Sequence, residues 1–240
     1  MKKLTIFLPI IAFFLVLCSE APELPAPTNR TVLAEFFTDD GWPICASAEQ
    51  ALDSLKKLYG DSLAIISYNH TLCPAAIADE RANLYGFPVY PTVVFDGTDE
   101  VFEPNPDSLL TTYDDHIQAA KADTPQYNLE LTATATPNAG NLQLNIVTAD
   151  TIPVGEIFTY IAICQDSIHG FLMPYFNYVC QQMYSFPLDL VHPDTLDTTI
   201  AFNHSIPVGQ MSAIIFIQNM NTKKIMHAIT KDFEEVQWEY

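Results

Sequence analysis

Basic side chains are scarce in this sequence of 240 residues, which has 10 lysines and arginines against 29 aspartates and glutamates. Its formal net charge is −19 at pH 7. Binding to nucleic acids depends on clustered lysine and arginine, and so does attraction to anionic membrane surfaces. The composition therefore argues against a nucleic-acid partner, and it leaves a membrane contact only through a covalent lipid.

Glycine is scarce as well, with eight residues in the whole chain. The sequence has no glycine loop of the kind that holds phosphates and no G-x-S-x-G elbow for a nucleophilic serine. Four histidines are scattered among segments of strand and loop composition, as is typical of structural residues: His169, His192, His204 and His227. We expect no cofactor and no bound metal.

Apolar residues are abundant instead, at 49% of the chain, which excludes a disordered acidic tail. The first of them form a run from Leu4 to Cys18, after Lys2 and Lys3. This charged start and short apolar run predict a secretory signal peptide over residues 1–18. We therefore expect an extracytoplasmic protein, in the periplasm, at the cell surface or secreted, with a lipid anchor at Cys18 as an alternative to simple cleavage.

A proline-rich tether is predicted over residues 19–30, because this segment contains three prolines and has no apolar periodicity. The next segments alternate between strand and helix patterns, with strands at 31–38, 63–68 and 92–95 and helices at 45–59, 75–85 and 105–122. Such alternation predicts an α/β domain with parallel strand pairs over residues 31–123.

The second half has a different pattern. From Tyr127 onward, short β-branched and apolar segments are separated by turns, and no helical period of useful length occurs. This favours an all-β, immunoglobulin-like sandwich over residues 124–240. The segment Phe171–Phe186 is dense in aromatic residues and methionine, and we interpret it as a cap over the sandwich, with an exposed partner-binding loop as the alternative.

Several motifs of the first half together resemble a thioredoxin-like domain. They are VLAEFFT, DDGWPIC before a helix, a strand ending in SYN, and GFPVYPTVVFDG. The closest likeness is to bacterial secreted or outer-membrane-associated proteins in which such a domain, bearing F-T-x-x-W-C-x-x-C, precedes a β-sandwich. The resemblance implies a cis bond between Tyr90 and Pro91, in a loop that faces the redox pair.

The chain departs from that family at the cysteine that attacks the substrate. Counting from Thr38 places Cys45 at the second cysteine position and Trp42 at the first, and alignment by the tryptophan gives Pro43 and Ala46. Dithiol exchange needs a low-pKa thiolate to attack and a second thiol to resolve the mixed disulfide. The redox motif is therefore degenerate.

Four cysteines remain after Cys18, an even number in a compartment that permits disulfides. Chain order favours pairing Cys45 with Cys73 and Cys164 with Cys180. We favour a structural role for the first bond, which closes a loop of 27 residues. In the chain-entropy model this closure stabilises the folded state by roughly 3–4 kcal/mol. A relocated redox pair is the alternative, and a metal site formed by both thiols and His70 is a third interpretation, which lacks a fourth ligand.

Two functions are compatible with these features. The first is a non-catalytic envelope protein that serves as a scaffold or binds extended peptides or envelope proteins along the edge formed by Trp42, Tyr90 and Pro91. The second is an extracytoplasmic thiol–disulfide oxidoreductase that uses Cys45 and Cys73 as catalytic residues. An accessible disulfide is required by the second function and not by the first.

Overall fold

The computed structural model describes residues 30–149 and 155–236. The predicted signal peptide, the lipidation position Cys18 and all but the last residue of the predicted tether lie outside the described residues. The described part holds no helix long and apolar enough to cross a membrane.

The first half of the chain forms the strands and helices that its periodicity predicts. The strands are β1 (Val32–Thr38), β2 (Leu63–Asn69), β3 (Thr92–Phe95) and β4 (Asp99–Val101); the helices are α1 (Pro43–Tyr59), α2 (Ala75–Leu84) and α3 (Leu109–Ala120), with a short 3₁₀ helix η1 (Gly60–Ser62). Pro43 begins α1, where its missing N–H costs nothing, and Lys56 and Lys57 lie in the last turn, where positive charge is favourable.

The second half forms strands and one short 3₁₀ helix, η2 (Val208–Gln210). The strands are β5 (Tyr127–Thr136), β6 (Ala139–Thr148), β7 (Ile157–Gln165), β8 (Val179–Pro187), β9 (Thr195–Asn203), β10 (Met211–Asn219), β11 (Ile225–Asp232) and β12 (Glu234–Glu235). Strand β8 lies in the segment that was expected to cap the sandwich, so that interpretation is wrong for residues 179–186.

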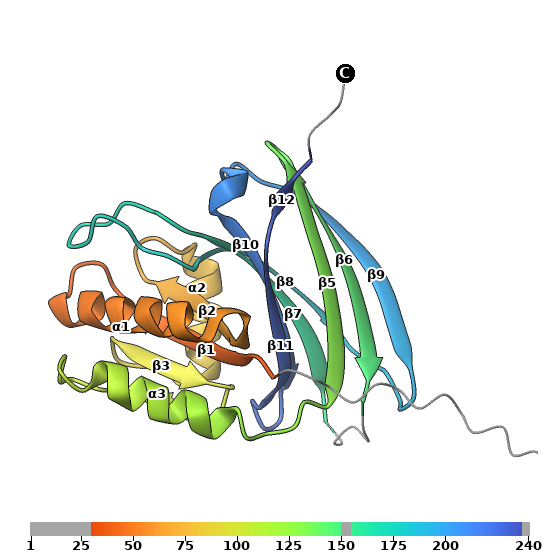
Figure 1. The fold of residues 1–240 in the computed structure, drawn as a ribbon, viewed down its shortest axis with the longest axis horizontal. Coiled ribbons are helices and arrows are strands. Elements are labelled where there is room, and N and C mark those ends of the chain that lie inside the picture. The colour runs from red at the N-terminus through yellow and green to blue at the C-terminus, as the bar shows by residue number, and fades with distance from the viewer. Residues whose placement is uncertain (1–29, 150–154, 237–240) are drawn as a thin grey trace, which may run out of the picture.

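The strands join into two sheets, and the larger sheet contains strands from both of the predicted domains (Figure 1). One sheet has eight strands in the order β11-β10-β7-β8-β2-β1-β3-β4, and the other has four in the order β12-β5-β6-β9. The junction is the parallel bridge between Ser67 of β2 and Val179 of β8. Strands from both halves therefore belong to one mixed sheet.

The predicted fold class, an α/β thioredoxin-like domain followed by an all-β immunoglobulin-like sandwich, is therefore wrong. The described chain is mostly β, with three α-helices, and its larger sheet runs continuously from the first half into the second. The physical reason is that apolar periodicity predicts strands but not their partners. Residues 67 and 179 are far apart in sequence, and nothing in the local pattern announces their pairing.

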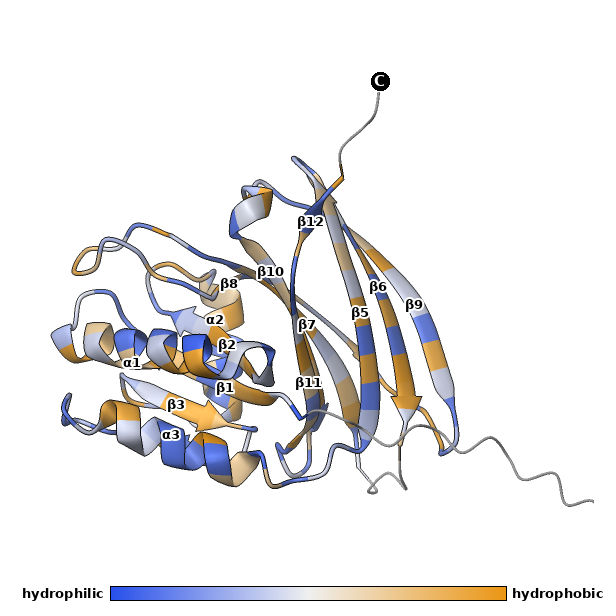
Figure 2. Cartoon of the chain, in the orientation of Figure 1, coloured by the Kyte–Doolittle hydropathy of each residue, from blue (hydrophilic) through white to orange (hydrophobic). Residues whose placement is uncertain are grey.

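Three apolar cores hold the layers together. One lies between β1–β3 and the helices α1 and α3, and a second packs the four-stranded sheet against β7, β10 and β11. The third covers the opposite face of the large sheet and includes Ala78 and Ala82 of α2. Strands β7 and β10 contribute to the last two cores, which explains their nearly unbroken apolar sequence (Figure 2).

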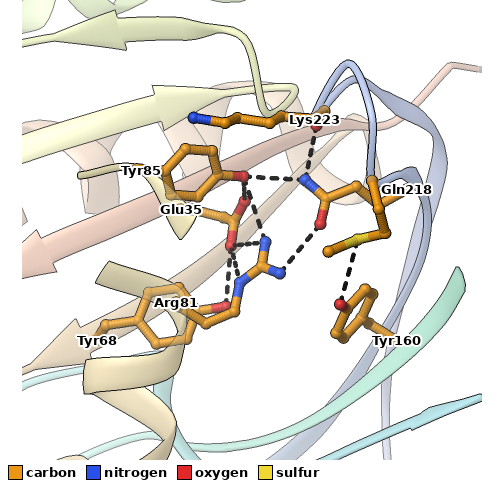
Figure 3. A network of polar contacts seen from close by, with 8 residues as sticks. Glu35, Tyr68, Arg81, Tyr85, Tyr160, Gln218 and Lys223 are labelled. Carbon is orange, nitrogen blue, oxygen red and sulfur yellow. Dashed lines mark hydrogen bonds and ion pairs between the residues drawn. The ribbon is translucent and has the colours of Figure 1, made fainter. Parts of the chain in front are cut away.

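A buried polar network crosses the junction between the halves (Figure 3). Arg81 of α2 donates to Glu35 of β1 from Nε at 2.9 Å and from Nη2 at 2.6 Å, and its Nη1 donates to Gln218 of β10 at 3.0 Å. Tyr68 and Tyr85 donate their hydroxyls to the two oxygens of Glu35. Both charged side chains are almost fully buried, so each depends on the other for its charge partner.

We predict that Arg81→Met lowers the free energy of unfolding by about 3–5 kcal/mol, because it leaves the Glu35 carboxylate buried without its cation. Urea unfolding of the purified protein measures the loss. Lys224→Met is the matched control, since Lys224 pairs with Asp123 at 2.8 Å in a half-exposed position. Its cost should stay below about 1 kcal/mol. Equal losses in the two variants would contradict a special role for the buried pair.

Candidate functional site

The candidate site lies at the edge of the large sheet where β1 and β2 end. These strands run parallel, with Thr38 opposite Asn69, so the loops that follow them emerge on the same side. β3 is antiparallel to β1, with Thr92 opposite Phe37, which brings the loop before β3 to the same edge. The resemblance implied that the loop with Tyr90 and Pro91 faces the position of the redox pair, at the start of α1.

Trp42 and the Tyr90–Pro91 pair both lie at this edge, as expected. Trp42 is the N-cap residue of α1, and 60% of its surface is exposed. The Tyr90–Pro91 bond is cis, as the resemblance implied. The Tyr90 ring faces His70 with a centroid separation of 6.1 Å, and partial burial and then Asp39 raise the pKa of its hydroxyl.

A fourth loop, residues 166–178 between β7 and β8, reaches the edge from the second half of the chain. Its attachment point is Asp40, whose Oδ2 accepts from the Phe171 N–H at 3.2 Å and whose Oδ1 accepts from the Thr71 hydroxyl at 2.8 Å. One carboxylate thus connects three loops. The density of aromatic residues raised an exposed partner-binding loop only as the alternative to a cap, and the sequence did not place this loop at the edge with Trp42 and Tyr90.

Two loops, residues 85–91 and 166–178, and the start of α1 supply large apolar side chains here, all of them exposed except Tyr90, which is partly buried. We call them the apolar edge: Trp42, Phe87, Val89, Tyr90, Phe171 and Tyr175. Phe171 is the extreme case, at 84% exposed. The carboxylates of Asp39 and Asp40 flank these side chains, and Asp39 lies 3.5 Å from Nδ1 of His70. The edge combines apolar surface with negative charge.

Loop 166–178 is also held to helix α1 by two acidic side chains, of which Glu49 is buried and Asp53 is partly exposed. Glu49 is 2% exposed, and its Oε1 accepts from the Asn177 N–H at 2.9 Å, while its Oε2 has no partner among the described residues. Asn177 also donates its side-chain amide to Asp53 at 3.3 Å. Burial, followed by repulsion from Asp53 and Asp166, raises the pKa of Glu49 to about 8. Glu49 is therefore mostly protonated at neutral pH.

Neither of the two predicted catalytic cysteines, Cys45 and Cys73, lies where a thiolate is favoured. Cys45 is fully buried at the start of α1, and burial is the main cause that raises its pKa, with Asp39 and Glu49 adding to it. The Cys73 thiol contacts Cys180, and this contact together with burial raises its pKa strongly. A thiolate is the nucleophile in disulfide exchange, so both groups are poor nucleophiles at neutral pH.

All four cysteines of the described chain are free thiols in the structure. The contact found for Cys73 is with Cys180, so the expected Cys45–Cys73 bond stays a prediction without support from the geometry, and Cys164–Cys180 also stays a prediction. Across residues 30–149 and 155–236, no group of three or more histidine, cysteine or acidic side chains is arranged to hold a metal ion. His70 turns toward Asp39 and Tyr90 rather than toward two thiols.

Comparisons with known proteins bear on the fold. No protein-family model and no curated protein matches the sequence significantly. Among solved structures, HBP35 of Porphyromonas gingivalis is similar with a TM-score of 0.72 at 11% identity, over 90% of this chain and 80% of that one. Protein AGR_C_4864 from Agrobacterium tumefaciens is similar with a TM-score of 0.60 at 14% identity, over 90% of this chain and 100% of that one.

Both likenesses extend across the junction between the halves. What is shared is therefore the whole β-rich arrangement of two sheets, not an α/β domain alone, which agrees with the corrected fold class. At such low identity the likeness shows the fold and nothing about activity. Membership of the thioredoxin-like family stays a prediction.

We predict that stability falls as the pH rises between about 5 and 8, because folded Glu49 holds its proton up to about pH 8 while the unfolded chain releases it near 4.5. This contribution is fully present below the lower value and lost above the upper one. Glu49→Gln mimics the protonated form. It should therefore abolish this fall in the free energy of unfolding, which is on the order of a few kcal/mol. Urea unfolding at several pH values measures the slope.

The matched control is Glu130→Gln, a change to an exposed carboxylate on β5. If Glu49→Gln and the unmodified protein have the same pH slope, Glu49 does not keep its proton in the folded state.

Proposed function

We propose that this protein is an exported envelope protein whose apolar edge binds extended segments of partner proteins. The observation that carries the proposal is that large apolar side chains, most of them exposed, come to one edge of the sheet from the start of α1 and from two loops, one of which, residues 166–178, is bonded to Asp40 and Glu49. Contiguous exposed apolar surface is uncommon on monomeric proteins and marks interaction sites. Aromatic side chains such as Trp42 are also the residues that most often dominate binding energy.

Charge indicates what kind of segment would fit. Asp39 and Asp40 flank the apolar side chains, and the whole chain has a net charge of −19. An acidic rim attracts basic partners and repels acidic ones. The favoured occupant is therefore an extended segment that alternates apolar residues with lysine or arginine.

An extracytoplasmic location forms part of the proposal and rests on the charged start and apolar run of residues 1–18. The alternative function, a thiol–disulfide oxidoreductase using Cys45 and Cys73, gains no support from the structure. Both thiols are buried, their pKa values are raised, and the contact of Cys73 is with Cys180.

The test uses two labelled extended peptides of the same length and the same apolar residues, with lysine at the alternating positions in one and glutamate in the other. Fluorescence anisotropy with the purified full-length mature protein should show clearly tighter binding of the lysine peptide. Trp42→Ala should weaken that binding about tenfold or more, because it removes a central aromatic anchor.

Leu58→Ala is the matched control: Leu58 is 71% exposed, and it lies at the opposite end of α1 from the edge. It should leave affinity unchanged. The proposal fails if the two peptides bind equally, or if Leu58→Ala weakens binding as much as Trp42→Ala does.

A further inference from the structure

Three of the buried cysteines converge in one place. Cys73, from the loop after β2, contacts Cys180 of β8, and Cys180 also contacts Cys164 of β7. All three belong to the apolar core that covers the α2 face of the large sheet. Cys180 is thus shared between two neighbours, one from each half of the chain.

The backbones around Cys73 and Cys180 are held together by contacts of their own. Gln181, next to Cys180, donates its side-chain amide to the carbonyl of Leu72, next to Cys73, at 3.2 Å. The Ser67 N–H donates to the Tyr178 carbonyl at 2.8 Å, where β2 and β8 meet. A disulfide requires its two Cα atoms to be held within a narrow range of separations, and these contacts provide such support.

We propose that Cys73 and Cys180 form a disulfide in the exported protein and that Cys164 remains a thiol. The bond covalently joins the first half of the chain to the second at the β2–β8 junction. It differs from both pairings that chain order favours, because Cys180 takes its partner from the other half.

Two physical arguments favour Cys73 over Cys164 as the partner. Cys164 lies on β7, which is paired on both sides by β10 and β8, so its backbone has less freedom to adjust to a disulfide. Cys73 lies in a loop, where small adjustments cost less. A Cys73–Cys180 bond also closes a much longer loop than a Cys164–Cys180 bond, so it removes more entropy from the unfolded chain.

The chemistry needs an oxidant, and we assign that role to a disulfide compound such as oxidised glutathione. One cysteine, as its thiolate, attacks that disulfide, forms a mixed disulfide and releases one glutathione thiolate. The second cysteine thiolate attacks the protein sulfur of the mixed disulfide and releases the second glutathione. The protein loses two protons and two electrons, and the oxidant becomes two thiols.

This exchange must take place before the core closes. In the folded protein Cys180 is fully buried and Cys73 nearly so, and their raised pKa values leave few thiolates. Once formed, the bond is shielded from reductants in the same way. It is therefore a structural bond that fixes β8. Because β8 begins directly after loop 166–178, the bond also fixes the end of the loop that supplies Phe171 and Tyr175 to the apolar edge.

The test maps disulfides in the exported protein. Free thiols are alkylated in denaturant, the chain is digested without reduction, and cross-linked peptides are identified by mass spectrometry. We expect one peptide pair that joins Cys73 to Cys180, with Cys45 and Cys164 alkylated. Cys45→Ser and Cys164→Ser should leave this bond intact.

Two further variants test whether Cys180 can pair with either of its neighbours, Cys73 or Cys164. Cys73→Ser frees Cys180 for its other neighbour, so a Cys164–Cys180 bond should replace the first one. Cys180→Ser should remove both bonds and leave Cys73 and Cys164 alkylated. A Cys45–Cys73 bond, a Cys164–Cys180 bond or no bond in the unmodified protein would overturn the proposal. These results do not depend on peptide binding, so either proposal can fail without the other.

Discussion

The buried ion pair between Glu35 and Arg81 is the constraint on which the rest of the structure depends. Neither charge can remain in an apolar interior alone, because desolvation of an unpaired ion costs several kcal/mol. Tyr68 and Tyr85 from the first half donate to Glu35, and Gln218 from the second half accepts from Arg81. The Arg81 guanidinium also lies over the Tyr160 ring at 4.9 Å from its centroid. The two halves must close on each other before this network is complete, so the pair links the folding of α2 and β1 to that of β7 and β10.

Much of the local structure could be predicted from the sequence, and the long-range pairing could not. The continuous apolar run of Leu63–Tyr68 predicted a buried strand, and β2 is one. Strand β8 was missed because its sequence mixes Cys180 with glutamines and aromatic residues, and its burial alternates only weakly. The predicted fold class was wrong because the bridge between β2 and β8 joins strands of both predicted domains into one mixed sheet. Apolar periodicity is a local signal and does not indicate a pairing partner more than a hundred residues away.

The candidate site was predictable to the same extent. Trp42 and the Tyr90–Pro91 pair could be placed at one edge because the resemblance implies that the Tyr90–Pro91 loop faces the start of α1. Phe171 could not, because its position depends on one hydrogen bond to Asp40, from a loop contributed by the other half. The buried carboxylate of Glu49 also escaped notice, since a glutamate in an amphipathic helix is normally read as solvent-facing. Both omissions concern contacts between halves.

The distribution of polar and apolar groups explains why binding is better supported than catalysis at this edge. Thiols, which would supply redox chemistry, are withdrawn into the cores, where burial suppresses the thiolate. Aromatic side chains, which gain most from being buried, are left in solvent at a cost that a partner could remove. Asp40 and Glu49 accept hydrogen bonds from the backbone of loop 166–178, which holds that loop in place. An edge held in this way is ordered before any partner arrives, so a bound segment loses less affinity to the ordering of the site.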